Sequence, residues 1–157
     1  MIRIILISLV LLIACKKPND RFCWKGAGKT VSEIRELPNK TVINIFDDAD
    51  VILIQDSLNY IDVESYSNLV SFIETNSIDT AIEIRNINRC NFIRDKDIEN
   101  IVTIHYSNIE ILNLYGTGKV TFMGEIIQHN LEINSYKSRS EFTINISCHR
   151  LECSFIE

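Results

Sequence analysis

Cys15 has the most distinctive chemical context in this chain. Arg3 supplies a positive charge, and the ten residues from Ile4 to Ile13 are apolar except for one serine. A charged start, a short apolar stretch and a small residue before the cut are typical of a secretory signal. A transmembrane helix would need about 20 residues. Because Leu12-Ile13-Ala14-Cys15 also resembles a lipobox, we expect residues 1–14 to be a signal peptide and Cys15 to be lipidated; the alternative is an apolar first strand of a cytosolic domain.

Lipidation would make residues 15–21 a polar tether on a membrane. Two or three acyl chains anchor firmly, because each buried CH₂ contributes roughly 0.8 kcal/mol. Lys16 follows the cysteine where an aspartate would signal retention, which favours the outer membrane. The chain has 16 basic and 21 acidic residues, with a formal net charge of −5. An acidic body without a basic cluster argues against nucleic acid as a partner.

Four further cysteines would remain in the mature chain. Exported proteins meet an oxidising compartment in which disulfides persist. Cys23 lies before the first expected strand and Cys90 in the loop after the fourth, so these two are a candidate disulfide. Such a bridge would contribute about 4 kcal/mol in the chain-entropy model. Cys148 and Cys153 continue apolar alternations, and we expect them to line the protein interior.

The other residues that could do chemistry have simpler explanations. Gly26-Ala27-Gly28-Lys29-Thr30 lacks the first glycine, the strand before and the helix after that a phosphate-binding loop requires, so we expect a flexible loop and no nucleotide. Asp47, Asp48 and Asp50 lack the spacing of a calcium-binding loop, so we interpret this segment as a solvated turn. Cys148, His149 and Cys153 offer only three zinc ligands. We expect no metal, no cofactor and no catalytic residue.

The two remaining histidines complete the set of candidate acid–base groups. His105 lies beside an expected strand end and His129 in an expected polar turn. No serine or cysteine with a matched base accompanies either of them. We therefore interpret both as isolated surface histidines.

Past residue 40 the composition is that of β-strands. Isoleucine occurs 28 times in the chain, against 5 glycines and 2 prolines. β-Branched side chains suit a pleated, half-buried surface. Short apolar or alternating runs predict strands at residues 42–46, 51–54, 60–64, 81–85, 119–123 and 141–146. Only residues 67–74 are compatible with a short helix.

The last third of the chain repeats itself. Asn108-Ile109-Glu110-Ile111 resembles Asn130-Leu131-Glu132-Ile133 and then Arg150-Leu151-Glu152-Cys153, at spacings of 22 and 20 residues. Strand, turn and strand in units of this length predict a β-solenoid, whose coils bury their apolar faces only by stacking. A β-sandwich is the alternative. If the repeats stack with Glu110, Glu132 and Glu152 facing outward, these three residues would form a like-charge ladder, which we interpret as solvated.

With these residues in view, the chain from residue 22 to residue 157 resembles the head GIN domain group of auto-transporter adhesins. The matching segments include Asp50 to Gln55, Ile101 to His105 and Tyr115-Gly116-Thr117-Gly118. The most specific match is Asn88-Arg89-Cys90-Asn91-Phe92-Ile93-Arg94. The resemblance implies a right-handed single-stranded β-helix on a lipid anchor, without established enzymatic activity.

The chain departs from this group in its length. Members of this group usually continue for several more coils, so we expect incomplete C-terminal coils here. The expected function is a non-catalytic, lipid-anchored cell-envelope protein that binds glycans or proteins. The alternatives are a polysaccharide-active β-helix enzyme and a truncated copy without activity of its own. An enzyme would need two carboxyl groups with separated pKa values, which a solvated ladder of Glu110, Glu132 and Glu152 does not supply.

Overall fold

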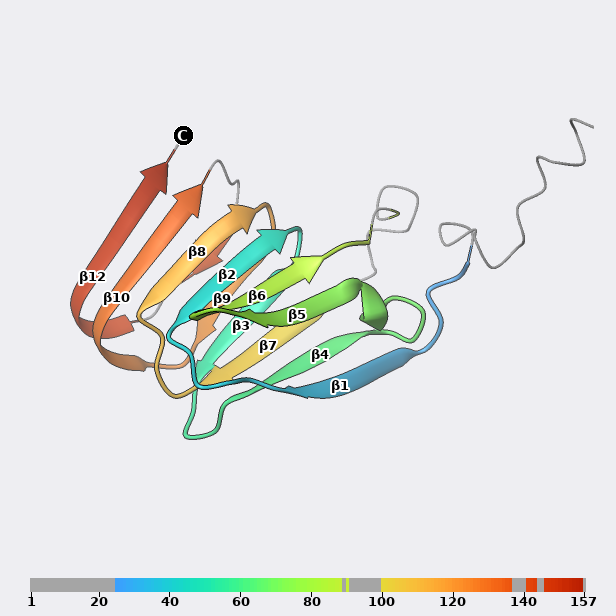
Figure 1. Ribbon diagram of the computed structural model, residues 1–157, viewed down its shortest axis with the longest axis horizontal. Coiled ribbons are helices and arrows are strands. Elements are labelled where there is room, and N and C mark those ends of the chain that lie inside the picture. The colour runs from blue at the N-terminus through green and yellow to red at the C-terminus, as the bar shows by residue number, and fades with distance from the viewer. Residues whose placement is uncertain (1–24, 89, 91–99, 137–140, 144–145, 157) are drawn as a thin grey trace, which may run out of the picture.

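The protein consists of β-strands in two layers (Figure 1). The computed structural model describes residues 25–88, 90, 100–136, 141–143 and 146–156. The expected signal peptide, the lipid site Cys15, the tether and Cys23 lie outside these ranges. Among the described residues, no helix has the length and apolar character to cross a membrane.

Each layer is a mixed six-stranded sheet. Sheet A has the order β1-β4-β7-β3-β9-β11, and sheet B has the order β12-β10-β8-β2-β6-β5. In sheet A the strands are β1 (Thr30–Glu36), β4 (Tyr60–Tyr66), β7 (Ile101–Tyr106), β3 (Asp50–Gln55), β9 (Lys119–Met123) and β11 (Glu141–Thr143). In sheet B they are β12 (Ile146–Ile156), β10 (Ile126–Tyr136), β8 (Ile111–Gly116), β2 (Val42–Asp47), β6 (Ala81–Asn86) and β5 (Ile73–Ile78).

Alternation of side chains along the strands builds a core between the two sheets. Successive residues of a strand point to opposite faces, so every second apolar residue is directed inward. The buried set includes Ile43, Ile45, Val51, Leu53, Ile82, Ile84, Val102, Ile104, Leu112, Leu114, Val120 and Phe122. Each such side chain contributes roughly 1.5–3 kcal/mol relative to full exposure. Ten of the isoleucines of this chain are buried in this layer.

The strands predicted at residues 42–46, 51–54, 60–64, 81–85 and 119–123 are all present as β2, β3, β4, β6 and β9. The prediction for residues 141–146 is confirmed at 141–143, where β11 lies. In residues 67–74 the short helix is reduced to a single 3₁₀ turn, η3 (Val70–Phe72), and β5 begins at Ile73. Two strands, β1 and β5, were not predicted, because most of their side chains are polar or exposed and show no apolar alternation.

The C-terminal strands stack in parallel and in a repeating register. Leu112 of β8 pairs with Ile133 of β10, and Leu131 of β10 pairs with Leu151 of β12. The displacement between the first two strands is thus 21 residues and not the predicted 22, because Glu110 lies in the bend before β8 and outside the ladder. At this level the protein is all-β with two mixed sheets that are not closed, an arrangement that fits the β-sandwich alternative.

Candidate functional site

Two corners of the chain pack directly on each other and define the candidate site. The corner after β8 lies on the corner after β2, and Thr117 donates its backbone N–H to the Asp47 carbonyl at 2.8 Å. A Cβ on Gly116 would lie 1.7 Å from the Asp47 carbonyl oxygen, and one on Gly118 would lie 2.0 Å from the Ala49 carbonyl oxygen. Glycine is therefore required at both positions by close backbone approach.

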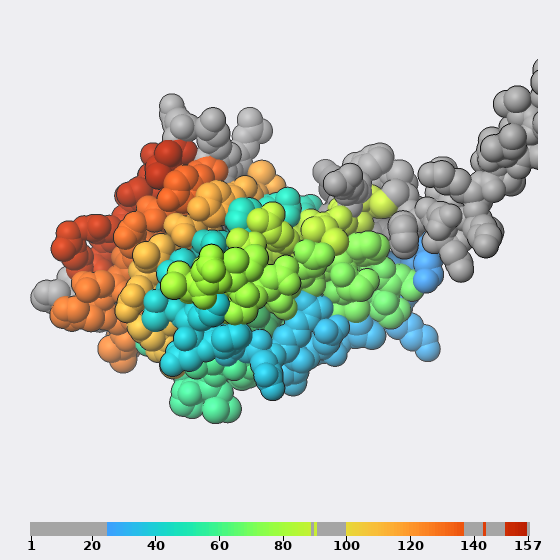
Figure 2. Space-filling view, viewed as in Figure 1, coloured from blue at the N-terminus to red at the C-terminus, as the bar shows by residue number. Residues whose placement is uncertain are grey.

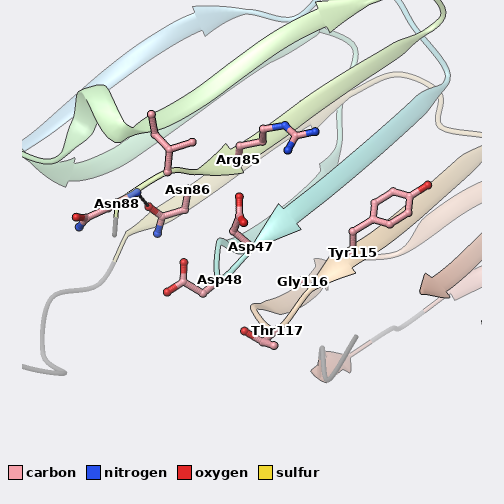
Figure 3. Close-up of a pocket in the computed structure, with 9 residues that line it drawn as sticks. Asp47, Asp48, Arg85, Asn86, Asn88, Tyr115, Gly116 and Thr117 are labelled. Atoms are coloured by element: carbon pink, nitrogen blue, oxygen red, sulfur yellow. Dashed lines mark hydrogen bonds between the residues drawn. The ribbon is translucent and has the colours of Figure 1, made fainter. Parts of the chain in front are cut away.

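Above these corners lies an open groove of about 540 Å³, at the C-terminal ends of β2, β6 and β8. We call it the β2–β6–β8 groove; its lining residues are Asp47, Asp48, Arg85, Asn86, Ile87, Asn88, Tyr115, Gly116 and Thr117. Figure 3 shows the two aspartates between the end of β6 and the Gly116–Thr117 corner. The volume lies within the range of about 300–1,000 Å³ that is usual for small-ligand sites.

A row of stacked side chains crosses the outer face of sheet B next to the groove. The Arg85 guanidinium carbon lies 3.7 Å from the centroid of the Phe46 ring. Phe46 stacks on Tyr115, and Tyr115 on Tyr136, each pair at a centroid separation of 4.7 Å and an interplanar angle of 11°. The stacking covers the ring faces, so Tyr115 offers a ligand its edge and its hydroxyl group rather than a flat aromatic platform.

A second row, of amides, runs parallel to the ring row. Asn113 donates its side-chain N–H to Asn44 Oδ1 at 2.8 Å, and Asn134 donates to Asn113 Oδ1 at 3.1 Å. Asn134 also donates to Glu132 Oε1 at 2.7 Å. These cross-strand bonds fix the outer face of β2, β8 and β10 as one surface.

The charges at the groove are mixed and partly compensated. Arg85 donates from both Nε and Nη2 to Glu83 Oε2 at 3.3 Å. Burial raises the pKa of Tyr115, and the neighbouring Tyr136 and Glu83 raise it further. The tyrosine hydroxyl is therefore neutral at physiological pH and can both donate and accept a hydrogen bond. Asp47 and Asp48 add acceptors, so the groove presents hydrogen-bonding groups of both kinds. Because Glu83 compensates the charge of Arg85, the two aspartates leave the lining with an excess of negative charge.

The histidine predictions need correction. His105 is not an isolated surface residue: it lies within β7, with Nδ1 3.2 Å from Asp56 Oδ2. Its ring stacks on Tyr60 at a centroid separation of 4.1 Å. His129 lies in β10 and not in a turn. Sequence spacing did not reveal these contacts because they join β4, β7 and the β3–β4 connection across sheet A.

The three aspartates of residues 47–50 have separate roles. Asp50 accepts a hydrogen bond from the Lys119 backbone N–H at 2.7 Å and links the corner to β9. Asp47 adopts a left-handed conformation, with φ of 64°, and lines the groove together with Asp48. In the part of the chain that the structure describes, no group of three or more His, Cys, Asp or Glu side chains is placed to hold a metal ion.

The predicted glutamate ladder is shorter than expected. Glu132 pairs with Glu152, but its partner on β8 is Ile111 and not Glu110. Arg150 forms an ion pair with Glu152, so the two-member ladder is partly neutralised.

The cysteine predictions have mixed outcomes. Cys153 pairs with the buried Ile133 and so lies on the inner face of its strand, as the apolar alternation predicted. It is nevertheless exposed and free, because nothing in the described chain covers that side of β12. Cys90 is buried and disulfide-bonded. Cys23 lies outside the described residues, as does the side chain of Cys148, so the Cys23–Cys90 pairing stays a prediction.

Sequence reasoning missed the residues of the two rows, although the sequence contains a signal for them. Asn44-Ile45-Phe46, Asn113-Leu114-Tyr115 and Asn134-Ser135-Tyr136 repeat an asparagine followed two residues later by an aromatic residue. Two-residue spacing places both side chains on one face of a strand. In-register stacking of the three strands then produces the amide row and the ring row.

The family and structural comparisons agree with the predicted resemblance. The family model described as "Putative auto-transporter adhesin, head GIN domain" matches residues 40–156. No curated protein matches the sequence significantly.

Solved structures of low sequence identity share the fold. A putative adhesin from Bacteroides fragilis superposes with a TM-score of 0.69 at 14% identity, covering 81% of this chain and 58% of that protein. A putative adhesin from Parabacteroides distasonis gives 0.65 at 14%, covering 82% and 53%. A putative lipid binding protein from the same species gives 0.59 at 16%, covering 83% and 64%. The chain thus spans between half and two thirds of the length of these proteins.

Proposed function

Because the chain belongs to the head GIN domain family of putative auto-transporter adhesins, we propose that it is a non-catalytic, lipid-anchored cell-envelope protein that binds hydroxyl-rich glycans. The β2–β6–β8 groove is the proposed binding site. The observation that carries this proposal is the lining of the groove, in which Asp47, Asp48, Asn86 and Asn88 border one open volume together with Arg85 and Tyr115.

The chemistry of the groove favours sugars over other ligand classes. Sugar hydroxyls both donate and accept hydrogen bonds, and the groove supplies partners of both kinds. Asp47 and Asp48 would repel phosphate and other polyanions, while Arg85 is already paired with Glu83. Ile87, which is 43% exposed, provides apolar surface for the carbon skeleton of a sugar ring.

The proposed attachment to the envelope rests on the sequence at Cys15. Residues 1–14 are the proposed signal peptide, residues 15–21 the lipidated tether and residues 22–157 the adhesin-like domain. We propose that the C-terminal strands are successive coils of a right-handed β-solenoid, which the parallel register of β8, β10 and β12 supports. A Cys23–Cys90 disulfide would tie the start of that domain to its body.

The groove proposal is tested by glycan binding to the purified protein. Asp47→Asn removes one carboxylate, and asparagine tolerates the left-handed backbone at this position. Arg85→Met removes the guanidinium while keeping an unbranched side chain. Glu125→Gln, an exposed charge change in the β9–β10 turn, is the matched control.

Glycan-array screening followed by isothermal titration should identify a bound glycan. The two groove variants should weaken its binding at least about tenfold, as expected for the loss of a charged hydrogen-bonding group, and the control should bind like the wild type. Equal binding by all three variants would exclude the groove. Release of unsaturated or reducing sugar ends would favour the polysaccharide-active alternative instead.

The anchor is tested separately from the groove. Mass spectrometry of the mature N-terminus should detect acylated Cys15, and Cys15→Ser should release the protein from membranes. Unprocessed Met1 on protein recovered from the cytosol would contradict the proposed envelope location.

A further inference from the structure

The buried wall of the β2–β6–β8 groove carries a hydrogen-bond donor without a partner. Asn86, at the end of β6, is 5% exposed and lines the groove. Its Oδ1 accepts from the Asn88 backbone N–H at 3.1 Å, whereas its Nδ2 has no partner in the part of the chain that the structure describes. Figure 3 shows this nitrogen on the side of the amide that faces Asp48. Buried polar groups are almost always hydrogen-bonded, so this N–H group is placed for an acceptor that a ligand supplies.

The direction of the Asn86 amide is fixed by its surroundings. The next residue, Ile87, donates its backbone N–H to the Phe72 carbonyl at 2.9 Å. Asn88 Oδ1 in turn accepts from the backbone N–H of Cys90, which is buried and disulfide-bonded, at 3.1 Å. A donor that is oriented before binding loses little conformational entropy when a ligand binds.

A carboxylate acceptor lies beside this donor. In the register of β2 and β6, Phe46 pairs with Arg85. The residues that follow them, Asp47 and Asn86, therefore lie next to each other at the ends of these strands, which are about 4.8 Å apart. The Thr117 backbone N–H binds the Asp47 carbonyl at 2.8 Å and fixes the backbone that carries this carboxylate. Because both side chains line the same groove, donor and acceptor are close enough to contact adjacent substituents of one sugar ring.

The carboxylate of this pair is accessible from solvent. Figure 2 shows the ends of β8, β2 and β6 side by side along the upper margin of the molecule. Asp47 is exposed, and within the described ranges its carboxylate has no hydrogen-bond or ion-pair partner. A ligand in the groove can therefore bind this carboxylate without displacing a protein group.

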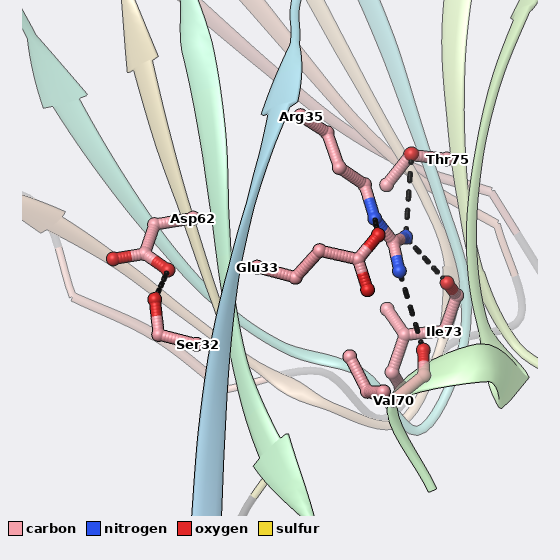
Figure 4. Close-up of polar contacts among 7 residues, drawn as sticks. All are labelled: Ser32, Glu33, Arg35, Asp62, Val70, Ile73 and Thr75. Atoms are coloured by element: carbon pink, nitrogen blue, oxygen red, sulfur yellow. Dashed lines mark hydrogen bonds and ion pairs between the residues drawn. The ribbon is translucent and has the colours of Figure 1, made fainter. Parts of the chain in front are cut away.

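Carboxylates near β1 are already engaged, in contrast to Asp47 (Figure 4). Asp62 accepts a hydrogen bond from Ser32 Oγ at 2.6 Å. Glu33 accepts from Arg35 Nε at 2.9 Å. The same guanidinium closes this end of the core, because it also donates to backbone carbonyls of η3 and β5. Asp62 therefore offers a matched control for changes at Asp47.

We propose that the groove selects glycans that carry a free amino group, a specificity that rests on the proposed glycan-binding function. The ammonium binds Asp47, and a neighbouring hydroxyl oxygen of the sugar accepts from Asn86 Nδ2. Arg85 does not cancel the charge of Asp47, because its guanidinium is paired with Glu83 at 3.3 Å. A hydrogen bond between an ammonium and a carboxylate is roughly twice as strong as one between neutral groups. An amino sugar therefore gains more at Asp47 than a neutral or N-acetylated sugar, and an acidic sugar is repelled.

Isothermal titration with two tetrasaccharides of identical linkage tests this preference. One consists of glucosamine and the other of N-acetylglucosamine, so the two differ only at nitrogen. The detergent-solubilised full chain should bind the glucosamine form about three- to tenfold more tightly. Because salt screens exposed charges, the preference should shrink as the ionic strength is raised to about 1 M.

Two variants should change the preference in opposite directions. Asp47→Asn removes the carboxylate at a left-handed position that asparagine tolerates, so the two sugars should bind about equally. Asn86→Asp keeps an acceptor for the Asn88 N–H but replaces the Nδ2 donor by a carboxylate oxygen. It should weaken the N-acetylated form at least about threefold and widen the preference for glucosamine, whereas a purely structural role of Asn86 would weaken both forms by the same factor. Asp62→Asn, the same carboxylate-to-amide change on sheet A, should keep the wild-type preference.

Three results would overturn the proposal. The first is a wild-type affinity for the N-acetylated form that equals or exceeds that for the glucosamine form. The second is an unchanged preference in Asp47→Asn. The third is displacement of the glucosamine form by tetralysine as readily as by free glucosamine tetrasaccharide, which would show that the groove responds to positive charge alone. If the groove binds only neutral or acidic glycans, the glycan-binding function stands and the amino-group preference fails, whereas both fail if no glycan binds.

Discussion

The stacking of the two corners beneath the groove predicts a large cost for one added methyl group. A Cβ on Gly116 would lie 1.7 Å from the Asp47 carbonyl oxygen and 2.7 Å from its carbonyl carbon. Both obstacles are backbone atoms, so no side-chain rotation relieves the overlap. The corners would have to separate by more than an ångström. Forced repacking of this kind costs about 1–3 kcal/mol, and we expect Gly116→Ala to lower the free energy of unfolding by at least that amount.

Two other glycines separate steric overlap from backbone conformation. Gly26 has no heavy atom within 4 Å of a built Cβ, so Gly26→Ala should leave stability unchanged or raise it slightly, by about 0.4–1 kcal/mol. Gly124 is equally open but has φ of 86°. Gly124→Ala should therefore cost about 1–2 kcal/mol from the left-handed backbone alone.

Urea denaturation of the three purified variants measures this series. The expected order of stability is Gly26→Ala first, then Gly124→Ala, then Gly116→Ala. A Gly116→Ala midpoint equal to that of Gly26→Ala would refute the close approach of the two corners. Loss of glycan binding by Gly116→Ala but not by Gly124→Ala would further connect the corners to the proposed groove.

Three further predictions concern the core and its edges. Arg35→Met leaves two backbone carbonyls of η3 and β5 without their charged donor and should lower the free energy of unfolding by about 1.5–3 kcal/mol, measured by urea denaturation; an unchanged midpoint would contradict a closing role for this residue. Tyr106 is 1% exposed, its hydroxyl has no hydrogen-bond partner in the described chain, and burial raises its pKa. Tyr106→Phe should therefore raise the free energy of unfolding by about 1 kcal/mol. A lower free energy of unfolding in this variant would show that the hydroxyl has a partner. The Ser57 backbone N–H and His105 hold the pKa of Asp56 below its usual 3.8, so the stability that Asp56 contributes is present above that pH and is lost as the pH falls through the lower folded-state pKa. Asp56→Asn should therefore flatten the acid limb of a plot of stability against pH. An acid limb identical to that of the wild type would contradict this.

The sequence by itself determined the all-β class, most strand positions and the family. Strands such as β2 and β9 carry period-two apolar alternation, which is a local property and survives without tertiary context. β1 and β5 lack this alternation because they lie at the edges of the sheets, where only one face or neither is buried. Edge strands obtain their conformation from a partner strand, so their own residues carry little signal.

The tertiary structure alone decided the register and the site. Whether Glu132 faces Glu110 or Ile111 depends on one residue in the bend before β8, and a shift by one residue moves side chains to the other face of the sheet. The same register brings Phe46, Tyr115 and Tyr136 into one stack from positions far apart in the chain. The groove exists because two corners meet at backbone contact distance, a relation that no local pattern specifies. Sequence thus determined which residues are strands, and long-range pairing determined which of them meet.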